Sequence, residues 1–302
     1  MGLRIDSAKG RQAAGKLHRA FATTGIHGRT DMPEDILPEG VERGSLEQLL
    51  FITFTVAIDY QRDASTLWAS SRESLRDPRT RYLYSPQALH DTPQATMTRD
   101  MQRYALAKKP TKDAWIWHTI GVSFCKKWKG DPRLFLADCG WNAPEVLRRL
   151  KEDTHLERGR PVSDYPYLCG DKIGPLWLRM LRDNVGVTEL RNLDRVPIPV
   201  DVHVARATLA LGIVKGGYSG SLGELFRPIR HAWFESVRGL SVPGREMMAL
   251  DVDEPLWHLS KYGCAARDTQ SGLCPHIRSC EVREFCIPGT IKVGTGIAEV
   301  RT

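Results

Sequence analysis

The sequence lacks a long apolar run, and this absence argues against a membrane-spanning segment. The longest apolar stretch among its 302 residues is LLFITFTVAI at 49–58, which is too short to cross a bilayer and contains two threonines. The first residues, MGLRIDSAKGRQAAGK, carry basic side chains but no apolar segment of the kind that a secretory signal requires. We therefore expect a soluble cytoplasmic protein that does not associate with membranes.

Strand patterns and internal repeats are also missing. No alternation of apolar and polar residues reaches a useful length, whereas many segments combine a polar N-cap with apolar residues at helical spacing. The hydrophobic content of 41% and the charged content of 26% are typical of a globular protein, and the length allows one large domain or two ordinary ones. The sequence thus predicts an all-α fold.

Caps and apolar spacing locate the expected helices. The segment 44–61, GSLEQLLFITFTVAIDYQ, begins with a capping-box pattern and predicts a buried helix, although its β-branched residues also suit a strand. Two segments are expected to be irregular: the proline-containing 77–96 as a loop or partly ordered insertion, and the glycine-rich 214–224 as a flexible connection. Further helices are predicted at 10–22, 98–109, 111–130, 142–153, 175–183, 187–192, 201–211, 228–238 and 254–262.

A net charge of +7 favours a polyanionic partner such as nucleic acid, although many basic proteins bind none. The stretch YLCGDKIGPLWLRML at 167–181 offers a contact for such a partner, because Gly170 and Gly174 lie in a short turn before a helix with Lys172 between them. Amides at a helix N-terminus attract anions, and glycines let a phosphate approach the backbone closely. An ordinary connection between two helices explains the same pattern, so both interpretations stay open.

Asp201 lies where a predicted helix begins, in the stretch VPIPVDVHVARATLAL at 196–211. A helix-capping role explains an aspartate at this position by itself. However, His203 and Arg206 follow on the same helix, and the glycine turn lies upstream. The helix dipole keeps such a carboxylate ionised, so it could also stabilise a cationic sugar or orient a water molecule.

Four of the seven cysteines fall within 23 residues and indicate a metal site, because thiols in a reducing compartment rarely form disulfides. They are separated by nine, five and five residues, without the short C-x₂₋₄-C spacing of most zinc sites. Four thiolates also suit an iron–sulfur cluster, and His276 could replace one of them. The four are Cys264, Cys274, Cys280 and Cys286, whereas Cys125, Cys139 and Cys169 are expected to be buried thiols.

In this order, the glycine turn, the aspartate segment and the four cysteines resemble the helix-hairpin-helix DNA glycosylases of the endonuclease III type, over residues 45–290. VPIPVDVHVAR is similar to the aspartate motif of that family, especially to its form in 8-oxoguanine glycosylases. CEVREFC at 280–286 fits the last C-x₅-C pair of the family's [4Fe-4S] loop, and EQLLFITFTVAIDYQRDASTLW at 47–68 resembles the first helix of its six-helix barrel and the turn after it.

The resemblance implies an all-α fold of two lobes. A six-helix barrel would occupy 45–195 and contain the hairpin 168–175, and a C-terminal helical lobe at 196–302 would hold a [4Fe-4S] cluster in the loop 264–286. The arm 1–44 would pack on the cluster lobe. The cluster ligands would be Cys264, Cys274, Cys280 and Cys286. DNA would cross the mouth between the lobes, with the target nucleotide flipped out of the stack.

The resemblance also assigns roles to single residues. Asp201 would stabilise the sugar cation as the N-glycosidic bond breaks. The family's bifunctional members carry a lysine two residues after the second hairpin glycine, where this chain has Leu176. We therefore expect a monofunctional glycosylase of base excision repair, a nucleoid-associated monomer that acts on double-stranded DNA containing a damaged or modified base. The DNA-binding residues would be Gly170, Lys172, Ile173, Gly174 and His203.

The sequence departs from the family in two places. The usual cysteine spacing is C-x₆-C-x₂-C-x₅-C and the usual hairpin is L-P-G-V-G, which appears here as LCGDKIG. Two alternatives therefore remain: a non-catalytic iron–sulfur protein that binds altered DNA, and a bifunctional glycosylase/lyase that uses Lys172. Candidates for the base pocket or for core packing are Tyr60, Gln61 and Trp177. Candidates for phosphate contacts near the cysteine loop are Arg267, Arg278 and Arg283.

Overall fold

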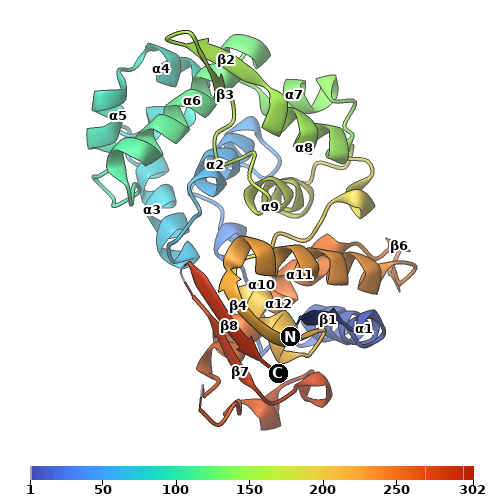
Figure 1. Cartoon of the computed structure of the whole chain (residues 1–302). Helices are drawn as coiled ribbons and strands as arrows, with labels where there is room; N and C mark the ends of the chain where they lie inside the picture. Colours follow the sequence, from blue (N-terminus) through green and yellow to red (C-terminus); the bar gives the residue numbers. More distant parts are fainter. Residues whose placement is uncertain (1, 269, 295) are drawn as a thin grey trace. The chain divides into compact units, whose positions relative to one another are not determined.

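The computed structural model describes residues 2–268, 270–294 and 296–302, and the chain forms two compact units (Figure 1). One unit combines both chain ends, Met1–Asp31 and Asp194–Thr302, and the other is Met32–Leu193. Residue 1 of the expected arm and residue 269 of the expected cysteine loop lie outside the described residues. In the part of the chain that is described, no helix has both the length and the apolar character needed to cross a bilayer.

The Met32–Leu193 unit is built almost entirely of helices. The predicted helix at 44–61 is confirmed as α2 and is buried along most of its length, and in the core the ring of Phe54 stacks on that of Trp117 at 5.2 Å between centroids. The elements are η1 (Pro33–Asp35), α2 (Leu46–Ala57), α3 (Ala64–Arg76), η2 (Arg81–Tyr84), α4 (Pro86–Asp91), α5 (Gln94–Asp100), α6 (Pro110–Trp128), α7 (Pro132–Asp138), α8 (Ala143–Glu152), β2 (Thr154–Glu157), β3 (Arg160–Ser163), α9 (Ile173–Met180) and the π-helical η3 (Leu181–Val185).

The segment 32–44 belongs to this unit, which corrects the prediction that the whole of 1–44 packs on the cysteine lobe. Glu34 in η1 forms a buried ion pair with Arg179 in α9. Asp35 accepts a hydrogen bond from the side-chain amide of Asn184 at 2.7 Å. A buried charge is costly unless it is paired, so the Glu34–Arg179 pair fixes the segment against α9.

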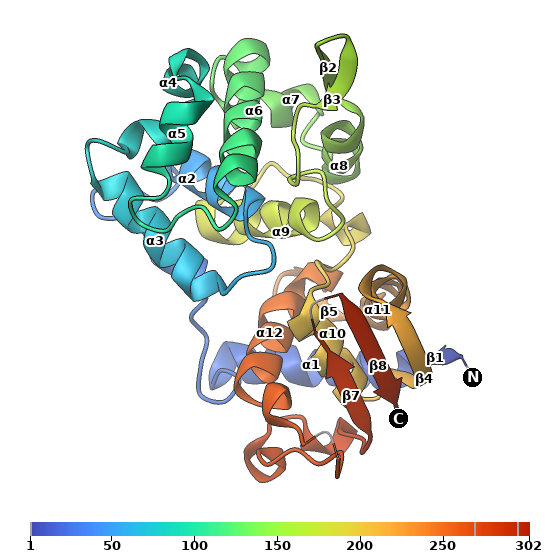
Figure 2. The same ribbon diagram turned by 60° about the vertical axis from the view of Figure 1, so that its left-hand side comes forward.

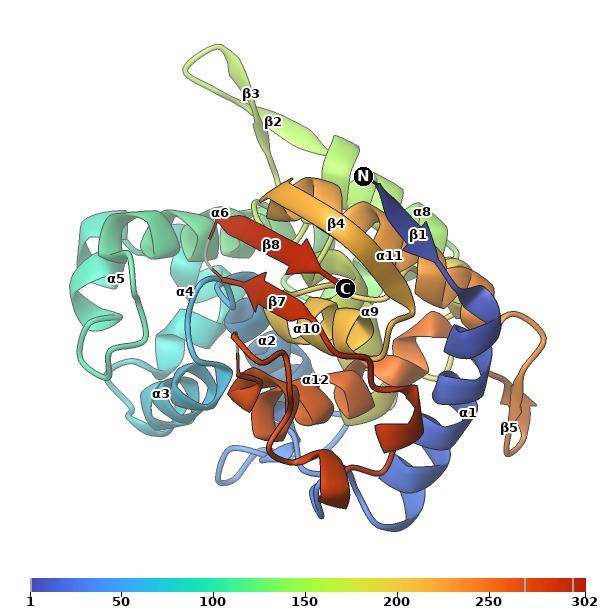
Figure 3. The same ribbon diagram turned by 60° about the horizontal axis from the view of Figure 1, so that its bottom comes forward.

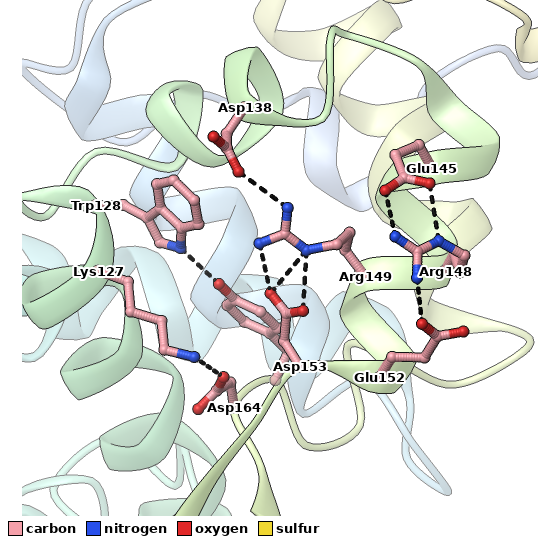
Figure 4. A network of polar contacts seen from close by, with 10 residues as sticks. Lys127, Trp128, Asp138, Glu145, Arg148, Arg149, Glu152, Asp153 and Asp164 are labelled. Atoms are coloured by element: carbon pink, nitrogen blue, oxygen red, sulfur yellow. Dashed lines mark hydrogen bonds and ion pairs between the residues drawn. The ribbon is translucent and has the colours of Figure 1, made fainter.

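A network of polar contacts joins the β2–β3 hairpin to α6 and α8 (Figure 4). Lys127 in α6 contacts the buried carboxylate of Asp164, just after β3. The indole of the neighbouring Trp128 donates to the Tyr165 hydroxyl at 2.7 Å, and Arg149 in α8 pairs with Asp153 at 2.9 Å. These contacts anchor the chain immediately before the 167–172 turn, so they hold that turn in place.

The described residues in the unit of the two chain ends form four α-helices, several 3-10 turns, a four-stranded sheet and a two-stranded hairpin. α10 packs against both α11 and α12, and α1 lies against the same two helices (Figure 2). Its elements are β1 (Leu3–Ile5), α1 (Ser7–Thr23), η4 (Leu193–Arg195), α10 (Val202–Ala210), β4 (Val214–Ser221), α11 (Leu222–Val237), β5 (Ser241–Val242), β6 (Arg245–Glu246), η5 (Ala249–Val252), α12 (Asp253–Tyr262), η6 (Cys264–Ala266), η7 (Ile277–Ser279), η8 (Arg283–Phe285), β7 (Thr290–Val293) and β8 (Ile297–Arg301).

The chain is mostly helical, as predicted, and its described residues also form a four-stranded sheet that the sequence did not predict. Its strands run in the order β1-β4-β8-β7, and every neighbouring pair is antiparallel, with Leu3 opposite Gly216 and Tyr218 opposite Val300. The helices α10 and α11 pack against it (Figure 3). The segment 214–224, expected to be a flexible connection, thus contributes β4, because distant chain ends supply the partners of its glycine-rich backbone.

Other boundaries also differ from the predictions. The segment 77–96 is largely helical, because Ser85 caps α4 and Pro86 occupies its first position, where a proline is tolerated. Pro228 lies inside α11, so that helix begins at Leu222 and not at 228 as expected. The segment 187–192 is not helical, and most of 98–109 is also non-helical, because α5 ends at Asp100.

His258 in α12 is completely buried, and neither ring nitrogen has a hydrogen-bond partner among the described residues. Its ring lies among those of Phe21, Trp257 and Tyr262. Burial lowers the pKa of His258 from its ordinary 6.5 to about 4. The histidine is therefore neutral in the folded unit, whereas the unfolded chain takes up a proton below pH 6.5.

This buried histidine predicts a loss of stability in acid. As the pH falls from 6.5 to 4, His258 should lower the free energy of unfolding by up to about 3 kcal/mol, and above pH 6.5 it should have no such effect. The measurement is urea unfolding at pH 4.5, 5.5 and 7.5 for the wild type and for His258→Phe, which keeps a ring but does not titrate. Equal pH dependence in both proteins would refute the assignment.

Candidate functional site

The carboxylate of Asp201 caps α10 with only one of its two oxygens, and this bears out the predicted capping role. Oδ1 accepts hydrogen bonds from the amides of His203 at 2.8 Å and Val204 at 2.9 Å. The residue is half-buried. Since both cap bonds use the same oxygen, Oδ2 is not committed to the cap.

The two polar side chains that follow Asp201 are held by α12 and the sheet. The Nδ1 atom of His203 lies 3.3 Å from the Ser260 hydroxyl, and its ring packs on that of Trp257. Arg206 donates to the same hydroxyl at 3.1 Å and to the Val293 carbonyl at 2.9 Å. The N-terminal turn of α10 is therefore anchored to α12, which fixes the direction of Asp201.

The 167–172 turn is built differently from the expected phosphate cradle. The Gly170 amide donates to the Tyr167 carbonyl and the Gly174 amide to the Gly170 carbonyl, both at 2.9 Å, so these two amides are already used. Tyr167, not a glycine, has the left-handed backbone, with φ of 66°. Gly174 lies within α9, and a β-carbon there would come within 2.8 Å of the Leu147 side chain. This glycine therefore serves close packing between α9 and α8.

The other hairpin residues have contacts inside their own unit. Lys172 reaches the nearly buried Asp59, with Nζ 3.2 Å from the carboxylate and 3.1 Å from the backbone carbonyl. Ile173 and Leu176 are buried in α9, and Trp177, a candidate for the base pocket, is a core residue whose indole donates to Thr53 at 3.0 Å. Lys172 is thus a partly buried ion-pair partner and not an exposed phosphate ligand.

Aromatic rings and lysines gather beside this turn, in what we call the tyrosine–lysine surface: Tyr60, Tyr167, Lys108, Lys109 and Lys112. The two tyrosine rings lie 4.6 Å apart. The ammonium of Lys112 is 4.8 Å from the Tyr167 ring, and that of Lys109 is 5.4 Å from the Tyr60 ring. All three lysines are exposed. Exposed cations next to aromatic faces are the combination that binds nucleic-acid backbones and unstacked bases.

Asp113 organises the tyrosine–lysine surface from the first turn of α6. Its buried carboxylate accepts from the backbone amides of Lys108 at 2.8 Å and Lys109 at 2.9 Å, and it contacts the Tyr60 hydroxyl. Burial, reinforced by this carboxylate, raises the pKa of Tyr60 far above its ordinary value. The tyrosine therefore remains a neutral hydrogen-bond donor, and the loop that carries the lysines has a fixed path.

The four clustered cysteines line one narrow cavity in the unit of the two chain ends, although 21 residues lie between the first and the last. Burial, followed by the neighbouring thiols, raises the pKa of Cys264, and burial raises the pKa of Cys280 to about 11. Four thiolates can share this cavity only with a cationic group that compensates their charge. The C-terminal end of α10 also lines it, and the Ile287 amide donates to the Ala210 carbonyl at 2.9 Å.

A single zinc ion in this cavity would require its sulfur ligands to lie close together. A tetrahedral zinc site would hold its sulfurs only about 3.8 Å apart, given bonds of about 2.3 Å. Within the described residues, the group of potential ligand atoms that lie within 4.8 Å of one another is His27, Cys280 and Glu281, with a single cysteine. Among the described residues, no three of the four cysteine sulfurs lie within that distance of one another.

The arginines near the cysteines have different roles. Arg267, expected to meet phosphate, is 8% exposed and donates to the Gly272 carbonyl at 2.9 Å and to Cys286 Sγ at 2.9 Å. It therefore supports the cysteine loop from inside. Arg278 and Arg283 are exposed, as the phosphate hypothesis requires.

Sequence reasoning missed several residues of these sites. Lys109 and Lys112 stand in the short run AKKPTKD just before a helix, a basic signal that could have identified them. Tyr167 precedes the glycine turn that was predicted to bind phosphate, but no sequence pattern indicates its left-handed backbone conformation. His27 at the cysteine cavity lies more than 230 residues from the cysteines, so spacing could not have found it.

Comparisons with known proteins add no family to these observations. The sequence matches no protein-family model and no curated protein.

Proposed function

We propose that this chain is a monofunctional DNA glycosylase that removes a damaged or modified base from double-stranded DNA. The observation that carries the proposal is the geometry of Asp201, whose Oδ1 takes both cap bonds while Oδ2 is not committed to the cap. The resemblance of VPIPVDVHVAR to the aspartate motif of helix-hairpin-helix glycosylases supports the same role. The tyrosine–lysine surface and the net charge of +7 support a nucleic-acid partner.

In the proposed reaction, the bond between the sugar C1′ and the base nitrogen breaks and its electron pair leaves with the base. The sugar becomes an oxocarbenium-like cation, which the Asp201 carboxylate stabilises. Water then attacks C1′ and loses a proton, which leaves an abasic site and a free base. The base must leave the helical stack first, because its glycosidic bond is not accessible inside a duplex.

The proposal includes the finer fold, a two-lobed helix-hairpin-helix glycosylase architecture, and a [4Fe-4S] cluster held by Cys264, Cys274, Cys280 and Cys286. When bound, the cluster would act as a cross-link of the cysteine loop. The loop contacts the last residues of α10, whose nine residues put Asp201 about 13 Å away along the helix. The cluster is thus assigned to positioning α10 and not to the reaction at the sugar.

Two residues at the start of α9 support the lack of lyase activity. Leu176 stands where bifunctional relatives would carry the lysine, and it is 7% exposed. Lys172, the alternative nucleophile, is ion-paired with Asp59, and a charged ammonium cannot attack C1′. If Lys172 did attack, borohydride would trap a covalent adduct between the protein and DNA. This trapping assay therefore distinguishes a bifunctional glycosylase/lyase from a monofunctional glycosylase.

The experiment that tests the proposal is a panel of duplexes, each with one modified or mismatched base, scored for free base after incubation with the full chain. We expect one or a few duplexes to lose their base and to acquire a site that breaks only on treatment with alkali or heat. Binding to altered duplexes without release of any base would favour the non-catalytic alternative.

The tyrosine–lysine surface yields a prediction about DNA affinity. Lys109→Ala combined with Lys112→Ala should weaken binding to all duplexes alike, because phosphate contacts carry no sequence information. The slope of log affinity against log salt should become shallower by about two, since each phosphate contact contributes about 0.9. The measurement is fluorescence anisotropy over a range of salt concentrations.

Lys292→Ala is the matched control, because this exposed lysine is in β7 and is paired with Glu299. It should leave both affinity and slope unchanged. If the double variant keeps the wild-type slope, the tyrosine–lysine surface does not contact phosphate.

A further inference from the structure

His27 comes from the N-terminal segment of the chain but lies at the cysteine cavity. It occupies a tight turn in which Ile26 and Arg29 exchange backbone hydrogen bonds, and its own φ is 52°. The His27 backbone amide donates to Glu281 Oε1 at 2.8 Å. Since Glu281 follows Cys280 directly, this bond fastens the turn to the cysteine loop.

The His27 ring lies at the cysteine cavity, where its centroid is 6.1 Å from that of the His276 ring. Its Nε2 atom is buried and has no hydrogen-bond partner among the described residues, and the same holds for Glu281 Oε2. A ring nitrogen of His27, Cys280 Sγ and a carboxylate oxygen of Glu281 all lie within 4.8 Å of one another. A β-carbon on Gly263 would come within 2.5 Å of His27 Nε2, so the ring also covers the residue before Cys264.

A buried polar atom without a hydrogen-bond partner is costly, so this arrangement indicates a partner supplied by a bound group. Cysteine sulfurs bound to iron and the inorganic sulfides of a cluster carry negative charge and accept N–H hydrogen bonds. Such bonds help to set the reduction potential of a cluster, and groups around the ligands help to retain the metal.

We propose that His27 donates its imidazole N–H to the sulfur at Cys280 when the four cysteines hold their iron–sulfur cluster, so that the N-terminal segment positions and protects that cluster. This inference rests on the cluster part of the proposed function. His27 is a positioning residue here, not a ligand. Glu281 holds the turn in place by accepting the hydrogen bond from the backbone amide of His27.

The test compares His27→Phe, which removes the donor, with His27→Gln, which keeps an N–H at similar reach. Holoprotein purified without oxygen is mixed with an iron chelator, and cluster loss is followed by its visible absorption. The cluster's reduction potential is measured on the same samples. His27→Phe should lose its cluster roughly 10–100-fold faster, as for other groups that support metal ligands, and its potential should shift to a more negative value. His27→Gln should stay close to wild type.

His231→Phe is the control, because His231 is an exposed histidine of α11 that lies outside the described lining of the cysteine cavity. It should change neither property. The inference is overturned if His27→Phe behaves as wild type, or if His27→Gln loses the cluster as fast as His27→Phe, since the turn would then act by packing alone. A wild-type protein that contains no iron would also overturn the inference about His27. The catalytic role of Asp201 would still be tested separately, by the release of base from duplexes.

Discussion

Cys286→Ser is expected to lose the cluster and to destabilise the unit of the two chain ends by on the order of several kcal/mol, because metal binding in such loops is coupled to folding. Cys286 lines the shared cavity and accepts a hydrogen bond from Arg267, which also holds the carbonyls of Gly272 and Ile287. Loss of the ligand therefore loosens the loop that contacts the end of α10. Iron content and thermal unfolding followed by circular dichroism measure the two effects.

Cys125→Ser is the control, since Cys125 lies in α6 of the other unit. It should keep the full iron content and nearly the same melting temperature. Anaerobically purified wild type should be brown and contain about four irons per chain. Stoichiometric zinc without iron in the wild type, or four irons retained in Cys286→Ser, would contradict the cluster assignment.

Asp201→Asn is expected to abolish most base release while leaving the fold intact. Asparagine keeps an oxygen that can accept the bonds from His203 and Val204, so stability should change by no more than about 1 kcal/mol. The substitution removes the charge that stabilises the sugar cation, and groups of this kind are worth roughly 10²–10³ in rate. The quantity to measure is the rate constant of base release, with DNA affinity and unfolding as checks.

The features that the sequence predicted correctly are local ones. The helix cap at Asp201 depends on a few adjacent residues, and the buried helix α2 depends on a continuous apolar run. Both could therefore be predicted from residues that are neighbours in the sequence. The four cysteines are close in sequence and do line one cavity, as a shared site requires.

The features that the sequence did not predict depend on contacts between residues that are far apart along the chain. Strand β4 forms because segments from both chain ends pair with it, and its glycines gave no strand signal. Glu34 is ion-paired with Arg179, which lies 145 residues later in the chain. The segment 32–44 therefore belongs to the helical unit and not to the cysteine lobe, as had been predicted for the whole arm 1–44. The role expected of Gly170 and Gly174 failed because their amides bond within the turn and Tyr167 takes the left-handed backbone.

The most direct test of the account is single-turnover base release by wild type and Asp201→Asn, on the duplex that the wild type processes fastest. Both proteins should be present above their dissociation constants, so that binding does not limit the rate. The account predicts a folded, cluster-loaded variant that binds this duplex as tightly as wild type and releases base roughly 10²–10³-fold more slowly. Equal rates for the two proteins would mean that Asp201 is only a helix cap, and would contradict the proposed chemistry.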